Sequence, residues 1–103
     1  DFYDVHGDGV IKIIFTPGHT PGHQSVLVNL PKTGHMLFTG DACYTEDHWC
    51  DKCLPGLVAS SSDAAESVSK LRKVAKEHEA TVVWGHDPIS WKIWKKAPMF
   101  YYD

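Results

Sequence analysis

The run of residues 16–25 holds two histidines in a setting typical of metal-binding loops. Its sequence is Thr-Pro-Gly-His-Thr-Pro-Gly-His-Gln-Ser, so a Pro-Gly pair directly precedes both His19 and His23. Pro-Gly pairs interrupt regular structure and impose tight turns. A rigid turn that fixes the position of an imidazole is what a metal site requires. The doubled pattern therefore favours a functional loop over a surface loop that contains histidine by chance.

Three side chains that could bind a metal follow expected strands. Apolar runs predict strands at residues 10–15, 25–30, 35–39 and 81–84. A hairpin turn between the second and third strands makes the first and third run in the same direction. If the last strand is parallel to them, His19, Asp41 and His86 gather at one edge of one sheet, where open sheets bind ligands. Two imidazoles and a carboxylate suit Zn²⁺, Fe²⁺ or Mn²⁺.

The rest of the chain is expected to form a loop, two helices and a polar start. Residues 42–60 form a long irregular loop, and loops of this length are often functional. A helix is expected over 63–78 with Asp63 as its N-cap, because apolar residues recur there on one helical face. That face carries Ala64, Val68, Leu71 and Ala75. A short helix is expected within 89–96, and no strand is expected in residues 1–9.

Composition excludes several classes of protein. Apolar residues make up 43% of the 103 residues, and the net charge of −3 comes without the basic stripe of a nucleic-acid-binding protein. No apolar run approaches the ~20 residues of a membrane helix. The three cysteines, Cys43, Cys50 and Cys53, form no closed disulfide framework, which favours a reducing, cytoplasmic location. The Cys50–Cys53 pair leaves a loop, a metal and a disulfide role all open.

The motifs resemble those of the C-terminal half of metallo-β-lactamase-fold hydrolases, and within that superfamily most of all the N-acyl-homoserine lactonases, which are quorum-quenching enzymes. The matching pieces, in the same order, are the run 16–25, Thr39-Gly40-Asp41-Ala42-Cys43-Tyr44 and Gly85-His86-Asp87. The resemblance covers roughly residues 8–90. It implies an α/β (α+β) fold, in which one mixed sheet with a covering helix forms the C-terminal half of an αββα sandwich.

The resemblance also implies a metal site and a substrate. His19 matches a ligand of one metal, Asp41 matches the carboxylate that bridges two metals, and His86 matches a ligand of the second metal. Tyr44 matches the lactonase tyrosine that contacts the lactone and its developing oxyanion. The implied cofactor is Zn²⁺, two ions per complete site, with Fe, Mn or Co as alternatives.

Two further residues are expected to act from outside the ligand set. His23 is not a ligand in the family's pattern, and we expect it to support the loop. Asp87 directly follows His86, and we expect its carboxylate to orient that imidazole. Partners of this kind commonly fix the geometry of metal ligands.

One large part of the family's pattern is missing from the sequence. The other ligands come from a His-x-His-x-Asp-His motif, and no His-x-His occurs among the seven histidines. Each metal would have one histidine and a share of Asp41, whereas a catalytic zinc usually keeps about three protein ligands. The apolar run 10–15 indicates a strand buried on both faces, of which one helix can cover only one. Residues 1–103 are therefore expected to be one domain or a fragment that is inactive alone and needs the missing N-terminal half or a second copy in a homodimer.

Two other functions stay open. A thioester hydrolase of the glyoxalase II type also uses a Gly-His-Thr-x-Gly-His run, although Tyr44 and Gly-His-Asp favour the lactonase. A β-lactamase is less favoured, because Asp41 stands where zinc β-lactamases commonly have cysteine. From another class of protein, the chain could be a non-catalytic binding or assembly module that keeps a relic metal site.

Overall fold

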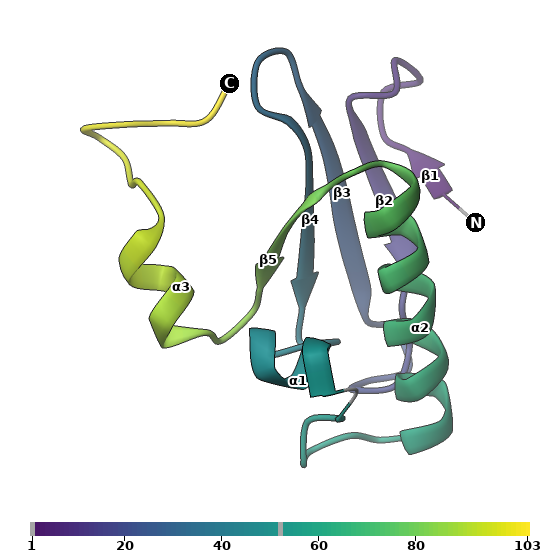
Figure 1. The fold of residues 1–103 in the computed structure, drawn as a ribbon. Helices are drawn as coiled ribbons and strands as arrows, with labels where there is room; N and C mark the ends of the chain where they lie inside the picture. The colour runs from purple at the N-terminus through teal and green to yellow at the C-terminus, as the bar shows by residue number, and fades with distance from the viewer. Residues whose placement is uncertain (1, 52) are drawn as a thin grey trace.

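A five-stranded mixed sheet organises the chain (Figure 1). The computed structural model describes residues 2–51 and 53–103. The strands are β1 (Phe2–Asp4), β2 (Ile11–Phe15), β3 (Gln24–Leu30), β4 (Gly34–Gly40) and β5 (Thr81–Trp84), and they lie in this order across the sheet. Neighbouring strands are antiparallel except β4 and β5, which are parallel. Strands β2, β4 and β5 therefore run in the same direction, which confirms the predicted mixed sheet.

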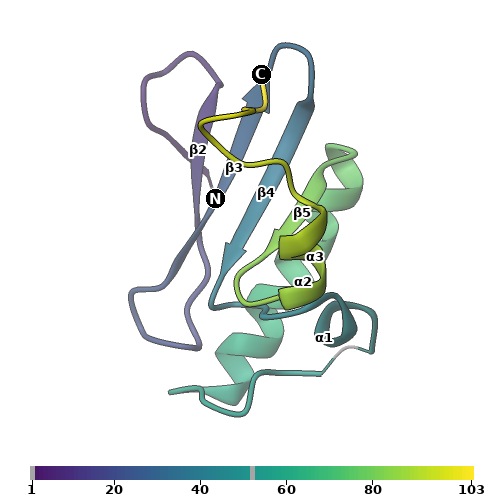
Figure 2. The ribbon, with the colours of Figure 1, turned by 90° about the vertical axis from the view of Figure 1, so that its left-hand side faces the viewer.

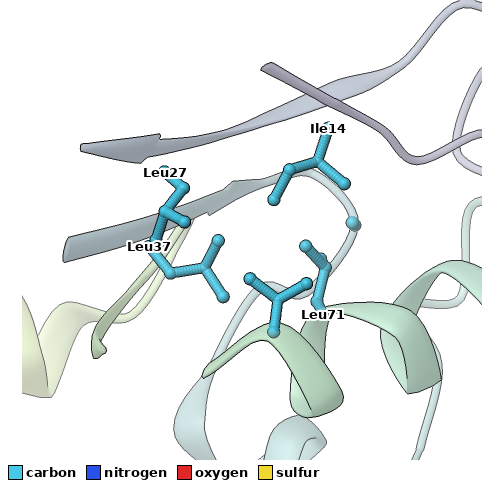
Figure 3. Close-up of a cluster of buried hydrophobic side chains, with 6 residues drawn as sticks. Ile14, Leu27, Leu37 and Leu71 are labelled. Atoms are coloured by element: carbon cyan, nitrogen blue, oxygen red, sulfur yellow. The ribbon is translucent and has the colours of Figure 1, made fainter. Parts of the chain in front are cut away.

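The long helix α2 (Ser61–Glu77) packs on one face of this sheet. Strands place alternate side chains on opposite faces, and the α2 face receives Ile14, Leu27 and Leu37. These three side chains meet Leu71 of α2 in a buried apolar cluster (Figure 3). The helix buries Ala64, Ser67, Val68, Leu71 and Val74. The predicted apolar face is thus the buried one, with Ala75 only partly buried.

Three local features differ from the sequence-based prediction. Strand β1 forms within residues 1–9, where no strand was expected, because its short Phe-Tyr-Asp segment pairs with β2. The short helix α1 (Glu46–Asp51) lies within the expected irregular loop. Thr45 begins it, since its hydroxyl accepts a hydrogen bond from the His48 N–H at 3.2 Å. The N-cap of α2 is Ser60 rather than Asp63, because the Ser60 hydroxyl accepts from the Asp63 N–H.

The opposite face of the sheet is apolar and only partly covered. Helix α3 (Pro88–Ile93) and the chain after it lie on this side (Figure 2). Together with the sheet they line a groove of about 830 Å³, to which the strands contribute Val28, Leu30, Met36, Phe38 and Val83. Within β2 only Ile14 is fully buried, and Phe15 is 50% exposed. Among the described residues α2 covers only one face of this strand, as expected, and the other face stays partly exposed. No helix among these residues is long and apolar enough to cross a membrane.

Replacing Leu71 by alanine tests the packing of α2 against the sheet. Leu71 has no exposed surface, so we expect Leu71→Ala to lower the free energy of unfolding by about 2–5 kcal/mol through lost burial and a residual cavity. Leu57 is 76% exposed and provides a matched control, because Leu57→Ala removes the same atoms from solvent. Denaturant unfolding of the protein at its natural full length, followed by tryptophan fluorescence, measures both changes. Equal losses for the two variants would contradict this packing.

Candidate functional site

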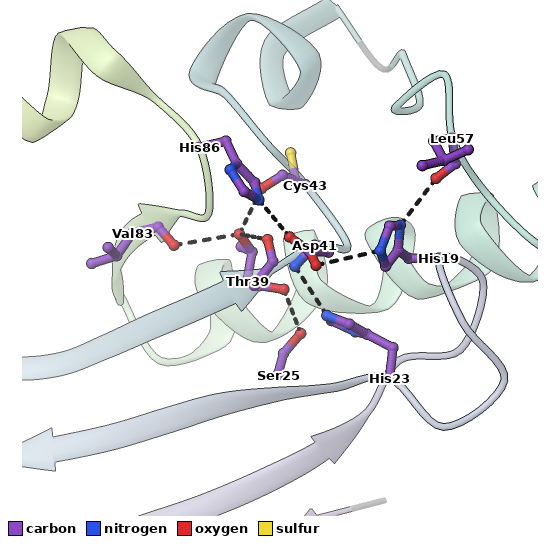
Figure 4. Close-up of polar contacts among 10 residues, drawn as sticks. His19, His23, Ser25, Thr39, Asp41, Cys43, Leu57, Val83 and His86 are labelled. Atoms are coloured by element: carbon purple, nitrogen blue, oxygen red, sulfur yellow. Dashed lines mark hydrogen bonds and ion pairs between the residues drawn. The ribbon is translucent and has the colours of Figure 1, made fainter.

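Asp41 lies between two imidazoles at the carboxyl ends of β2, β4 and β5 (Figure 4). Its Oδ1 is 2.6 Å from the Nε2 of His86, and its Oδ2 is 3.3 Å from the Nε2 of His19. The three side chains differ in exposure, at 19% for His19, 39% for Asp41 and 59% for His86. The structure thus brings together the three residues that the sequence placed at one sheet edge. Their role as metal ligands stays a prediction.

The loop after β2 is fastened to the segment that leads into α2. The Gly18 carbonyl accepts hydrogen bonds from the backbone N–H groups of Ala59 and Ser60, at 2.8 and 3.0 Å. Gly18 has φ +140°, and a Cβ there would overlap the backbone of Ala64. Glycine is therefore required both by the backbone conformation and by the close approach of the helix. These contacts place His19 so that its Nδ1 lies 3.0 Å from the Leu57 carbonyl oxygen.

His23 uses both ring nitrogens within the protein. Its Nε2 accepts a hydrogen bond from the Asp41 backbone N–H at 3.0 Å. Its Nδ1 lies 3.1 Å from the carbonyl oxygen of Thr16 and 2.9 Å from the hydroxyl oxygen of the same residue. Neither nitrogen is left to bind a metal, so the expectation that His23 supports the loop agrees with its contacts.

Buried hydroxyl groups continue this network beneath the site. Thr16, Ser25 and Thr39 are each at most 1% exposed. The Ser25 hydroxyl donates to the Thr39 carbonyl at 3.0 Å, so the 2.9 Å contact between Thr16 and Ser25 has the Thr16 hydroxyl as donor. The Thr39 hydroxyl donates to the Cys43 carbonyl at 2.8 Å. These bonds satisfy polar groups that burial would otherwise leave unpaired, and they join the ends of β2, β3 and β4.

His86 lies beside Asp41 because the residues before them, Gly85 and Gly40, are in close contact. A Cβ on Gly85 would overlap the carbonyl group of Gly40, so only glycine allows the two chain segments to lie this near. The Gly85 N–H donates to the Cys43 carbonyl at 3.2 Å, and the His86 N–H donates to the Tyr44 carbonyl at 2.9 Å. The segment after β5 is therefore joined by its backbone to the segment after β4.

Tyr44 lies beside both histidines of the site. Its ring centroid is 4.6 Å from that of His86 and 6.2 Å from that of His19, with edge-to-face geometry in both pairs. Its ring is also 6.3 Å from His48, a residue of α1 that the sequence did not single out. The phenol therefore lies near Asp41 and the imidazoles, as a residue that contacts a substrate there would need to.

The carboxylate of Asp87 has a different role from the one expected. Its Oδ1 accepts from the N–H groups of Ile89 and Ser90, which caps α3, and its Oδ2 accepts from the Glu46 N–H at 3.0 Å. The hydrogen bond from Glu46, followed by those from the α3 residues, holds the pKa of Asp87 below its usual value. Among the described residues its hydrogen bonds all go to these groups rather than to the His86 ring. Asp87 therefore acts through the backbone, by joining α3 to the start of α1.

The donor groups present suit a cation between His19 and Asp41. A carbonyl oxygen only accepts, so the contact with Leu57 requires the proton of a neutral His19 to be on Nδ1. Its Nε2 then directs a lone pair at a carboxylate oxygen 3.3 Å away, and a metal ion or a proton must lie between these atoms to make the contact favourable. Bonding of Nδ1 to a backbone carbonyl is also the usual arrangement of a metal-ligating histidine.

The ligand set on this chain is nevertheless incomplete. Asp41 presents a different oxygen to each histidine, so the three groups form a row rather than surrounding one point. Within residues 2–51 and 53–103, no group of three or more His, Cys, Asp or Glu side chains is arranged to hold a metal ion. Any ion bound between Asp41 and one of the imidazoles would need further ligands from elsewhere.

Comparison with known proteins assigns the chain to a family. The family model described as the metallo-beta-lactamase superfamily matches residues 1–86. The chain belongs to the metallo-β-lactamase superfamily. This membership agrees with the observed fold, a mixed sheet with α2 packed on one face. As a metallo-β-lactamase-fold chain, it has the general architecture that the resemblance predicted.

Relatives within this superfamily are lactonases. The chain is 59% identical over 101 residues to N-acyl homoserine lactonase AttM of Rhizobium radiobacter, covering 98% of this chain and 38% of the relative. It is 38% identical to an N-acyl homoserine lactonase of Bacillus cereus, covering 75% of this chain and 30% of that protein. A solved N-acyl homoserine lactone hydrolase, with the product N-hexanoyl-L-homoserine at its catalytic metal center, matches with TM-score 0.86 and 31% identity over 94% of this chain and 38% of that one. The chain thus spans well under half the length of these relatives.

The three cysteines should differ in reactivity. Cys43 is buried, and burial raises the pKa of its thiol to about 11, whereas Cys50 and Cys53 are exposed. At about pH 8 the Cys43 thiol remains protonated and inaccessible, so we expect iodoacetamide to modify the other two first. Peptide mapping by mass spectrometry measures the order, and denatured protein is the control in which all three react. Rapid labelling of Cys43 in the folded protein would contradict its position beneath the site.

Proposed function

We propose that this chain forms part of a metal-dependent hydrolase that opens the lactone ring of N-acyl homoserine lactones. The observation that carries the proposal is the position of Asp41, whose two oxygens face the imidazoles of His19 and His86 beside Tyr44. The likeness to lactonases over nearly all of this chain supports the substrate class. The reaction required is hydrolysis of an ester bond within a small ring.

Each of the four residues at this site would have its own role in such an enzyme. His19 and His86 would bind one metal each, and Asp41 would bridge the two with its separate oxygens. Bound zinc would supply Lewis acidity and lower the pKa of water to about 7, which makes hydroxide available near neutral pH. Tyr44 would direct its hydroxyl at the lactone carbonyl and stabilise the oxyanion that develops there. Imidazole and carboxylate donors favour Zn²⁺ and also accept Fe, Mn or Co.

The same proposal requires ligands from outside these residues. One imidazole and one carboxylate oxygen are fewer than the roughly three protein ligands typical of a catalytic zinc. We propose that the N-terminal half of a complete enzyme supplies the rest, with a second copy of the chain as the alternative. The apolar groove on the open face of the sheet supports a partner there, because burying it would remove apolar surface from water. We propose a cytoplasmic location for the assembled enzyme.

Replacing Tyr44 by phenylalanine tests its catalytic role. In the zinc-loaded protein at its natural full length, we expect Tyr44→Phe to lower kcat for an N-acyl homoserine lactone by up to about 10²–10³-fold, the usual effect of losing one oxyanion donor. Zinc content should not change, because the phenol is not among the proposed ligands. Tyr3 is 68% exposed in the edge strand and provides the matched control, Tyr3→Phe. Unchanged turnover in Tyr44→Phe would remove Tyr44 from the catalytic residues.

The dependence on another segment can be tested directly. We expect purified residues 1–103 to hydrolyse no lactone and to bind zinc weakly, because the ligand set is incomplete. Size-exclusion chromatography with light scattering, metal analysis and a pH-indicator assay of lactone opening give the three readouts. The full-length protein serves as the positive control. A well-folded monomer with two tightly bound zinc ions and lactonase activity would refute the proposal that the site needs a partner.

A further inference from the structure

We propose that His23 is a positioning residue that sets the direction of the Asp41 carboxylate by accepting a hydrogen bond from the Asp41 backbone. This inference rests on the proposed metal-dependent function and assigns His23 a defined part in it. The contact joins the His23 Nε2 to the Asp41 N–H at 3.0 Å, and it links the turn after β2 to the first residue after β4.

The protonation of His23 follows from its neighbours. Because the Asp41 N–H is a donor, the Nε2 that faces it must carry a lone pair. The single proton of the neutral ring is therefore on Nδ1, where it meets the carbonyl and hydroxyl oxygens of Thr16. The Thr16 hydroxyl can accept this proton because its own is donated to Ser25, whose hydroxyl donates to Thr39. The buried network thus specifies the tautomer that leaves Nε2 free to accept.

The backbone around Asp41 depends on this acceptor. Gly40 has φ +57°, a conformation that side-chain-bearing residues rarely adopt, and a Cβ on it would lie 2.9 Å from the His23 Nε2. Glycine therefore makes room for the imidazole directly against the chain. Without the imidazole, the Asp41 N–H would lose its partner and the peptide group before Asp41 could rotate. Such a rotation would move both carboxylate oxygens relative to His19 and His86.

Two amide substitutions separate this role from a general structural one. In His23→Gln the side-chain oxygen can reach the position of Nε2 and accept from Asp41. In His23→Asn the amide is one bond shorter, so it can reach the position of Nδ1 near Thr16 but not Asp41. Both variants therefore introduce an amide, but His23→Gln keeps the hydrogen bond to Asp41, whereas His23→Asn keeps only the contact with Thr16. The exposed His6 in the loop after β1 provides a control variant, His6→Asn.

The measurement is zinc affinity, by competition with a chromophoric chelator, in the protein at its natural full length. We expect His23→Asn to weaken zinc binding by about 10–100-fold, the usual effect of losing a residue that orients a ligand, while His23→Gln and His6→Asn stay within about threefold of the unsubstituted protein. Equal losses in the two His23 variants, or no loss in either, would overturn the proposal. The kcat of His23→Asn at saturating zinc should recover further than that of Tyr44→Phe, because its defect lies in binding the metal.

A second measurement does not require the variants to fold. Histidine ¹H–¹⁵N NMR of the unsubstituted protein should show His23 with its proton on Nδ1, and a proton on Nε2 would overturn the proposal. Failure of the proposed function has a separate signature. If the protein binds zinc with the expected pattern among the variants but opens no lactone, the substrate assignment fails and the positioning role of His23 stands.

Discussion

The site depends on one constraint, which is the close approach of the segment after β4 to the segment after β5. These strands are parallel, so their carboxyl ends reach the same edge, and the absence of a side chain at Gly85 lets its backbone lie against the Gly40 carbonyl group. A carboxylate one residue after the first glycine and an imidazole one residue after the second are then brought within contact distance. A methyl group at Gly85 alone would separate them.

Around this contact the site is held together mainly through backbone groups. The turn carrying His19 is bonded to the segment before α2, His86 is bonded to the segment after Asp41, and Asp87 joins α3 to α1. Each of the proposed metal ligands is therefore held by hydrogen bonds to a different segment, and these bonds restrict its movement before a cation binds. Preorganisation of this kind reduces the cost of binding a metal in a catalytic geometry. The incomplete ligand set and the half-covered sheet both indicate that another segment is needed. A segment placed against the open face of the sheet would lie near the site.

Much of the fold could be predicted because its signals are local. Apolar runs located β2, β3, β4 and β5, and the apolar spacing from Ala64 to Leu71 located the buried face of α2. Strand β1 was missed because its three residues, Phe-Tyr-Asp, are too few to form a recognisable apolar run, and they become a strand by pairing with β2. The N-cap of α2 was misplaced by three residues because Ser60 and Asp63 are both good capping residues, and the path of the preceding loop decides between them.

The sequence by itself determined which side chains could do chemistry and which strand ends would carry them. Pro-Gly turns and apolar runs are properties of neighbouring residues, so they placed His19, Asp41 and His86 after the ends of strands. That the three side chains share one edge also required β5 to pair in parallel with β4. Only the tertiary structure decided what the supporting residues do. Asp87 was expected to orient His86, yet it bonds to backbone N–H groups, and His23 accepts from Asp41 through a nitrogen whose protonation is set by buried hydroxyls. These roles depend on hydrogen bonds between segments far apart in the chain, whose partners and donor directions exist only once the sheet has formed.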